Sequence, residues 1–242
     1  MIVNFIRNSR TRFYLYLSKF TSQKIYWNIV GKISPLDAIL DNYFDQKEFF
    51  KTGKKEVDFF KKLRLFNSKS VSLHIGCGIG RIEKHLSRFI KECNGVDISE
   101  TMINQAIKLV NEKNCHFYAT DGKSLPFENN SIDFVYSILV FQHMAKSMFV
   151  KNLNEVKRVL KRGGKFFFQI PLDEKGIKEK PLEKNPWLMR YYHRTEVFQM
   201  LEKQGFQVKR TFDRFDKDVR GDLVPGFSIL AIKNKSIDNI HY

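Results

Sequence analysis

The chain has 242 residues and a formal net charge of +16, with 43% hydrophobic and 14% aromatic residues. This length suits one α/β domain with appended pieces better than two full domains, and the apolar content argues against intrinsic disorder. The charge favours contact with phosphates, carboxylates or anionic lipid. It fits a lysine-rich compositional bias equally well and does not select among these partners.

The sequence carries few signs of export or membrane insertion. No stretch approaches the roughly 20 apolar residues of a membrane-spanning helix, and the apolar run at 13–17 is too short for a signal peptide. Three cysteines, Cys77, Cys93 and Cys115, are odd in number and lie in or beside expected buried strands. They therefore suggest neither a disulfide framework nor a metal site, and we expect a cytoplasmic protein.

The N-terminal segment is basic, because residues 1–36 contain several Lys and Arg residues and no acidic residue. Apolar residues at helical spacing predict an amphipathic helix over 2–20. Such a helix can lie peripherally on an anionic membrane surface. We favour the alternative, a lid whose aromatic face packs on the domain, and assign 1–54 to a basic helical extension. The apolar face comprises Ile2, Phe5, Ile6, Phe13, Tyr16, Leu17 and Phe20.

Strands and helices alternate in the middle of the chain. Ser34, Pro35 and Asp37 together mark a helix start, and apolar spacing predicts a further helix over 54–65. Short apolar strands separated by amphipathic helices indicate a parallel sheet covered on both faces. Strands are expected at 71–75, 93–97, 115–119, 132–138 and 164–170, with helices at 80–91, 100–112 and 147–161.

The C-terminal part predicts a change in strand direction. A polar, proline-broken connection follows Pro171, and we assign 171–193 to the substrate side. Thr195 is expected to cap a helix that ends near Gln204. The last two apolar runs lack a crossover helix between them, so they should pair antiparallel at the sheet edge. The expected fold is α/β: a Rossmann-like, doubly wound, seven-stranded sheet over 55–242, with a helical N-terminal lid.

The stretch VSLHIGCGIGRIEKHL at 71–86 passes from a strand through three glycines into a helical pattern. Gly76, Gly78 and Gly80 are spaced G-x-G-x-G. Arg81 stands where the dinucleotide fingerprint G-x-G-x-x-G has its third glycine. The spacing therefore favours a ligand smaller than NAD, without a diphosphate.

Several further segments resemble the successive motifs of class I S-adenosylmethionine-dependent methyltransferases, in order and at the expected distances. They are GVDIS at 95–99, ATDGKSLPF at 119–127, SIDFVYSILVFQHM at 131–144 and EVKRVLKRGGKFFFQIP at 155–171. The resemblance covers about 55–233 and implies methyl transfer from S-adenosyl-L-methionine, with S-adenosyl-L-homocysteine as product. PLDAIL and EFFKTGKKEV at 48–57 resemble the leader of a subgroup associated with saccharide or cell-surface biosynthesis.

The resemblance also implies roles for the matched residues. Asp97 would accept hydrogen bonds from both ribose hydroxyls, a geometry that suits a carboxylate. Glycines at 76 and 78 would let the backbone approach the methionyl part. Asp121, which can alternatively cap a turn, would read the adenine amino group with Gly122. The full expected cofactor set is His74, Gly76, Gly78, Gly80, Asp97, Ile98, Met102, Asp121, Gly122 and Ser137.

His74 departs from the family pattern, which usually has Asp or Glu there to orient the glycine turn. A neutral imidazole cannot offset an ammonium charge. We therefore expect reduced cofactor affinity or a substitute contact, and we expect the change His74→Asp to tighten binding. Arg162 replaces a usual proline, which implies only a less rigid turn.

The methyl acceptor is less constrained. His143, after the fourth strand, is a candidate general base, although a packing role fits it equally well. Tyr191, Tyr192 and His193 either close over the acceptor or form a helix entrance. Three hypotheses follow: methylation of a small, saccharide-like or anionic acceptor; methylation of RNA along a basic surface, which we do not favour; and non-catalytic cofactor binding at a membrane surface.

Overall fold

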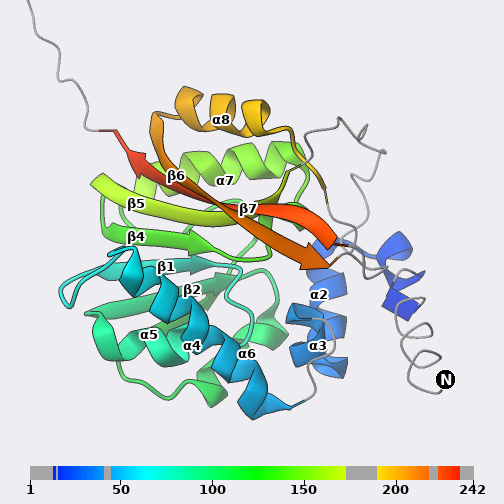
Figure 1. The fold of residues 1–242 in the computed structure, drawn as a ribbon. Coiled ribbons are helices and arrows are strands. Elements are labelled where there is room, and N and C mark those ends of the chain that lie inside the picture. Colours follow the sequence, from blue (N-terminus) through cyan, green and yellow to red (C-terminus); the bar gives the residue numbers. More distant parts are fainter. Residues whose placement is uncertain (1–12, 15, 41–44, 173–189, 218–222, 235–242) are drawn as a thin grey trace, which may run out of the picture.

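A computed structural model describes residues 13–14, 16–40, 45–172, 190–217 and 223–234, with only the backbone described at 214–217 and 223–227. Its centre is a seven-stranded sheet of order β3-β2-β1-β4-β5-β7-β6 (Figure 1). Strands β1 to β5 pair in parallel, and β7 runs antiparallel between β5 and β6. The doubly wound sheet with an antiparallel C-terminal pair is confirmed. The strands are β1 Val71–Ile75, β2 Glu92–Asp97, β3 Cys115–Ala119, β4 Ile132–Ser137, β5 Leu160–Pro171, β6 Phe206–Lys217 and β7 Leu223–Lys233.

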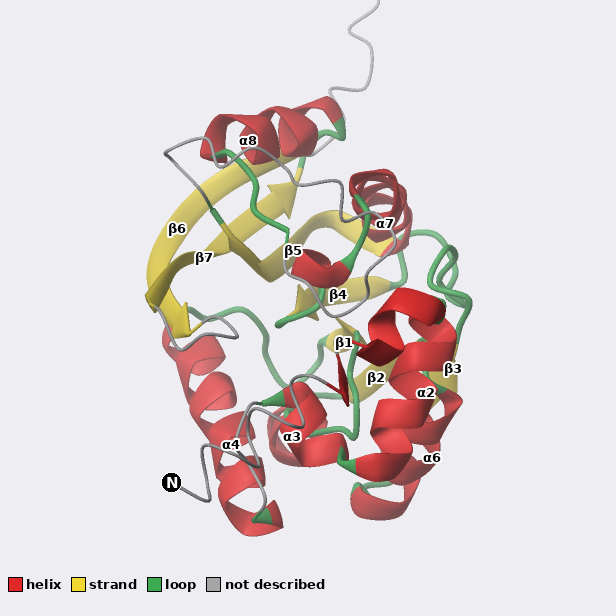
Figure 2. Ribbon diagram, turned by 90° about the vertical axis from the view of Figure 1, so that its right-hand side faces the viewer, coloured by secondary structure: helices red, strands yellow, loops and turns green. Residues whose placement is uncertain are grey.

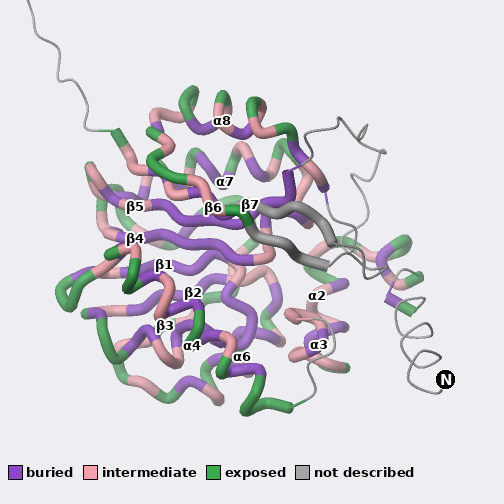
Figure 3. Tube along the Cα trace, viewed as in Figure 1, coloured by how far each residue is buried: buried purple, intermediate pink, exposed green. Residues whose placement is uncertain are grey.

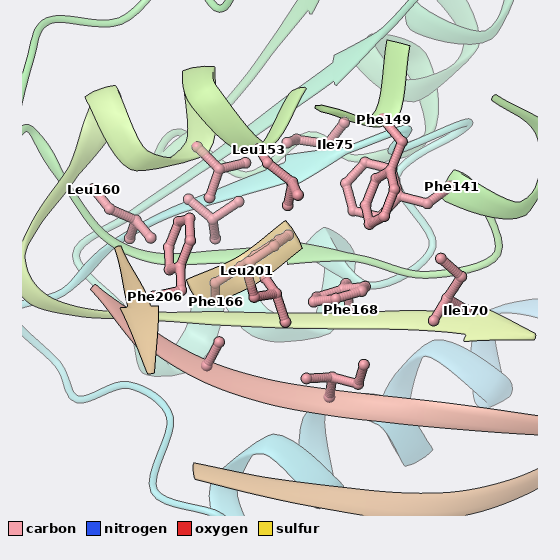
Figure 4. Close-up of a cluster of buried hydrophobic side chains, with 14 of the residues drawn as sticks. Ile75, Phe141, Phe149, Leu153, Leu160, Phe166, Phe168, Ile170, Leu201 and Phe206 are labelled. Carbon is pink, nitrogen blue, oxygen red and sulfur yellow. The ribbon is translucent and has the colours of Figure 1, made fainter. Parts of the chain in front are cut away.

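Helices cover both faces of the sheet (Figure 2). Helices α4, α5 and α6 cover one face of the sheet, and α7 and α8 cover the opposite face. Because side chains alternate along a strand, neighbouring residues enter different cores. Phe166 and Phe168 pack with α7 and α8 (Figure 4), whereas Phe167 packs with α4 and α5. The central strands are mostly buried (Figure 3). The helices are α4 Gln46–Lys62, α5 Glu83–Leu86, α6 Glu100–Leu109, α7 Lys146–Val159 and α8 Arg194–Lys203.

Three helix boundaries differ from the sequence prediction because local caps and packing decide them. Helix α4 starts at Gln46 rather than at 54, since the Asp45 side chain accepts a hydrogen bond from the Glu48 amide at 2.8 Å. Helix α5 is a single turn followed by the 3-10 turn η1 (Ser87–Phe89). Helix α8 is capped by His193, whose Nδ1 accepts from the Thr195 amide, and not by Thr195.

The N-terminal helices lie at the carboxyl ends of the parallel strands (Figures 1 and 2). They are a helical stretch at 16–20, α2 (Gln23–Ile33) and α3 (Pro35–Ile39). Residues 2–12 of the expected first helix and 173–189 of the expected connection lie outside the described residues. Among the described helices, none is both long and apolar enough to cross a membrane.

Three aromatic residues of the face that we expected to pack on the domain are exposed, whereas Leu17 of the same face packs beside Tyr14. The other members of that face, Ile2, Phe5 and Ile6, lie outside the described residues. Phe13, Tyr16 and Phe20 are 45%, 66% and 74% exposed. The opposite face is buried instead, and Tyr14 packs there against Tyr26 and Val30 of α2. The helix therefore attaches through one apolar face and presents a second one to the outside.

Candidate cofactor and active site

The glycine turn after β1 has the backbone conformation that its sequence predicts. Gly76 and Gly78 have φ angles of +75° and +54°, which residues with a Cβ rarely adopt. The amides of Gly76 and Cys77 both donate to the Val96 carbonyl, which ties the turn to β2. A Cβ on Gly76 would lie 2.3 Å from Val140 Cγ2, and one on Gly78 would lie 2.6 Å from Ile39 Cδ1. Both positions therefore require the absence of a side chain.

Gly80 has a different role from the other two glycines. Its φ is also positive, at +77°, but a Cβ there would meet Val110 at 2.7 Å and Phe117 at 3.1 Å. These neighbours lie after α6 and on β3. Gly80 thus permits close packing of the turn against the sheet edge.

Asp97, the last residue of β2, is held with both carboxylate oxygens oriented. Its Oδ2 accepts from the Gly78 amide at 3.0 Å, and its Oδ1 accepts from the Ser99 amide at 2.9 Å. Burial raises the pKa of the Asp97 carboxyl above its ordinary value, against the lowering effect of these two amides and of the His74 charge. The carboxylate is thereby fixed beside the glycine turn, where it fits a ribose diol.

His74 is paired with a carboxylate that the sequence analysis did not single out. Its Nδ1 lies 2.6 Å from Glu83 Oε1, and both side chains are buried. The Tyr136 hydroxyl donates to the same Oε1 at 2.6 Å, and its ring stacks on the imidazole with centroids 4.4 Å apart. Burial and the nearby Glu83 charge raise the pKa of Tyr136, so the hydroxyl keeps its proton.

The ionisation of Glu83 follows from this contact. Burial opposes the charged form, but the His74 charge and the hydrogen bonds from His74 and Tyr136 outweigh it and lower the pKa of Glu83. The acidic group expected at position 74 is thus supplied nine residues later, in the first turn of α5. The signal in the sequence was an acidic residue just after the glycine turn.

The expected adenine side is assembled from three segments. Ile98 Cγ2 lies 2.9 Å from the position of a Cβ on Gly122, so these two residues adjoin. Met102 is buried among Phe49, Phe50 and Ile79, which is a packing environment. Asp121 is exposed, and its Oδ1 accepts from the amides of Lys123 and Ser124, the turn-capping alternative.

Ser137 and Arg81 are both buried and engaged within the fold. The Ser137 hydroxyl donates to the Ile75 carbonyl at 3.0 Å, which joins the ends of β4 and β1. Arg81 donates to Thr52 Oγ1 at 2.9 Å and faces α4. Arg81 therefore belongs to the contact between the glycine turn and α4.

Comparison with known proteins agrees with this geometry. A family profile described as "Methyltransferase domain" matches residues 73–168, which include the glycine turn and Asp97. The uncharacterized protein MJ1123 of Methanocaldococcus jannaschii is 30% identical over 199 residues, which cover 77% of this chain and 88% of MJ1123. The chain belongs to the class I S-adenosylmethionine-dependent methyltransferases. The expected cofactor, S-adenosyl-L-methionine, and methyltransferase activity follow from this membership.

Further relatives add information on the fold. The uncharacterized methyltransferase YcgJ of Bacillus subtilis is 29% identical over 136 residues, which span 55% of this chain and only 52% of YcgJ. Its crystal structure has a TM-score of 0.61 at 17% identity and covers 76% of this chain and 100% of that one. The [4+2]-cyclase SpnF has a TM-score of 0.68 at 14% identity, covering 88% and 97%. The fold alone does not decide the reaction.

His143, the candidate general base, lies in the 3-10 turn η2 (Phe141–His143). Its carbonyl accepts from Gln23 Nε2 at 2.6 Å and from Arg190 Nη1 at 2.8 Å. Its ring packs edge-on against Trp27 of α2, with centroids 5.6 Å apart. The sequence analysis missed these α2 residues, because no local pattern indicates which distant turn a helix will contact.

The aromatic and histidine group at 191–193 forms the entrance to α8, the second alternative considered for it. Tyr192 is 1% exposed and packs against Phe149 in the core. Its amide donates to the Pro171 carbonyl. His193 is exposed and caps α8, while Tyr191 is half-buried. Tyr192 and His193 are thus engaged in packing and capping, and a role over the acceptor stays a prediction.

Proposed function

We propose that this methyltransferase acts on a small-molecule acceptor that binds between the glycine turn and α2. When bound, S-adenosylmethionine supplies an activated methyl group on its sulfonium, and in-line transfer leaves S-adenosylhomocysteine. Gly76 and Gly78 would let the backbone approach the methionyl part, and Asp97 would hold the ribose. The remaining task of the protein is to position the acceptor and exclude water.

The observation that carries this proposal is that α2 bridges the cofactor side and the acceptor side. Asn28 Oδ1 accepts from Ser99 Oγ at 3.0 Å and from the Thr101 amide at 3.1 Å, next to Asp97. On the same helix, Gln23 and Trp27 contact His143. A helix fixed on both sides roofs the carboxyl ends of the strands. This enclosure favours an acceptor small enough to be covered over an extended polymer such as RNA.

The charge of the chain favours an anionic or saccharide-like acceptor that carries an acidic group. With 42 Lys and Arg against 26 Asp and Glu, the surface potential attracts anions. The resemblance of residues 48–57 to the leader of a saccharide-associated subgroup points the same way.

His143 is proposed as the general base for an acceptor hydroxyl or protonated amine. Its backbone is fixed by Gln23 and Arg190, and its ring by Trp27, so the imidazole has a defined place at the acceptor side. It would accept the acceptor proton as the new bond to the methyl carbon forms. If His143 is only a packing residue, the substitution His143→Gln should leave the shape of the pH–rate profile unchanged.

The acceptor class is tested by transfer of a radiolabelled methyl group into fractionated cell extract. We expect label in the small-molecule fraction, retained on an anion exchanger and absent with Asp97→Ala. Asp58→Asn, a surface carboxylate paired with Lys54 on α4, is the matched control and should retain full transfer. Label confined to RNA would overturn the acceptor class. In the pH–rate measurement of His143→Gln, the control is His116→Gln, which replaces an exposed histidine on β3.

A further inference from the structure

The first described helix presents an aromatic stripe that nothing in the described part of the chain covers. Phe13, Tyr16 and Phe20 recur at the spacing of one helix face and are exposed, with the rings of Tyr16 and Phe20 in contact at 5.1 Å. The helix itself is anchored, because Tyr14 on its other face packs against α2. The stripe is therefore held outward by the fold.

The charged residues near this stripe in the sequence are basic. Lys19 lies next to Phe20, and Lys24 and Lys32 are exposed on α2. Ile25 and Ile33, their neighbours in sequence, are 52% and 55% exposed and extend the apolar surface. The sequence has no Asp or Glu before Asp37 to neutralise these lysines. Aromatic side chains flanked by lysines have the chemistry of a surface that contacts anionic lipid headgroups.

We propose that this face, made of Phe13, Tyr16, Phe20, Lys19 and Lys24, docks the protein on an anionic membrane surface. The rings would enter the boundary between headgroups and acyl chains, while the lysines contact the phosphates. The helix with the stripe packs through Tyr14 on α2, and α2 also covers the candidate acceptor site, so docking would place the carboxyl ends of the strands near the bilayer. The inference needs no methyl donor and stands apart from the proposed function.

Charge decides between this occupant and a second copy of the chain. Pairing two such faces would bring lysines of the same sign together without acidic partners, which opposes self-association. An anionic bilayer instead attracts each lysine, by about fivefold in binding per residue near the surface. The same argument predicts weaker docking at high salt, because surface charges are screened.

The test is co-sedimentation of the full chain with vesicles of phosphatidylcholine alone or with about one third phosphatidylglycerol. We expect binding to the anionic vesicles only, weakened more than about tenfold by Phe13→Ser/Tyr16→Ser/Phe20→Ser. The matched control is Phe89→Ser/Ile107→Ser/Tyr118→Ser, which removes three exposed apolar side chains from other elements and should bind like the wild type. Lys19→Glu/Lys24→Glu should also weaken binding, unlike the exposed pair Lys108→Glu/Lys113→Glu.

Several results would overturn the proposal. They are failure to bind either vesicle, equal binding to both, equal loss in the aromatic set and its control, or a dimer in sedimentation velocity that only the aromatic set dissociates. Circular dichroism and S-adenosylhomocysteine binding of each variant establish that it is folded. Loss of vesicle binding in a variant that keeps cofactor binding isolates the docking face from the cofactor site.

Discussion

His74 and Glu83 form a buried pair in which the imidazole Nδ1 lies 2.6 Å from the carboxylate Oε1. Tyr136 completes it by donating to the same oxygen. Strand β1 lacks the acidic residue that is usual in the family motif. The carboxylate of Glu83 in α5 lies against position 74 instead. This arrangement changes what substitutions at the glycine turn should do.

Glu83→Gln should destabilise the fold by about 3 kcal/mol at neutral pH, because it removes the charge that compensates His74 in a buried pair. Tyr136→Phe, which keeps the charge and removes one hydrogen bond, should cost only about 1 kcal/mol. The lowered pKa of Glu83 means that its contribution is complete above the unfolded value near 4.3 and is lost as the pH falls through the folded value. Urea unfolding of both variants from pH 7 down to acid pH measures this. Equal costs at every pH would contradict the ion pair.

His74→Asp should lower the stability of the fold and weaken cofactor binding. This is the opposite of the tighter binding expected from the sequence alone. The new carboxylate would face Glu83 in a buried site, so the two negative charges would repel each other. The substitution would also remove the positive charge that favours ionised Asp97. His74→Asp/Glu83→Gln restores a single carboxylate and should recover part of the lost stability and cofactor affinity. Calorimetric titration with S-adenosylhomocysteine checks both variants. Tighter binding by the single variant would show that Glu83 does not constrain position 74.

Gly76→Ala should abolish cofactor binding and cost about 3 kcal/mol or more, since it adds a Cβ at positive φ and forces it against Val140. Gly163→Ala is the matched control: its φ is +73°, and nothing lies within 4 Å of the new Cβ. It should cost only the backbone strain, about 1 kcal/mol, and leave binding intact. Similar losses in the two variants would assign the effect to strain alone.

Cofactor affinity should fall on acidification at a higher pH than an ordinary aspartate near 3.9 would produce, because burial raises the pKa of Asp97. Ionised Asp97 is costly in the folded state, and that cost disappears as the pH falls through its folded pKa. Protonation of Asp97 therefore weakens binding without weakening the fold. Binding of S-adenosylhomocysteine from pH 7.5 downward, with fluorescence as the folding check, tests this. Asp97→Asn should bind weakly and show no such pH step.

Sequence patterns predicted the strands because neighbouring residues determine where a strand and the turn after it form. Strand β1 and the turn after it are read directly from an apolar run followed by Gly76, Gly78 and Gly80, and β3 matches the prediction residue for residue. The family resemblance indicated Asp97 at the end of the second strand, and the structure has it as the last residue of β2, bonded to the Gly78 amide. For these strands and this turn, the order of residues along the chain was sufficient for the prediction.

The tertiary structure decided whatever depends on a contact between distant segments. The sequence shows no carboxylate at position 74, and only the packed structure places Glu83 of α5 against His74. In the same way, only the structure shows that Tyr192 packs against Phe149. The first helix is the same kind of case: the sequence predicts an apolar face, but only the packing of Tyr14 on α2 shows that Phe13, Tyr16 and Phe20 stay exposed. Periodicity in the sequence predicts that a side chain packs against another element, whereas only the tertiary structure determines which residues it contacts.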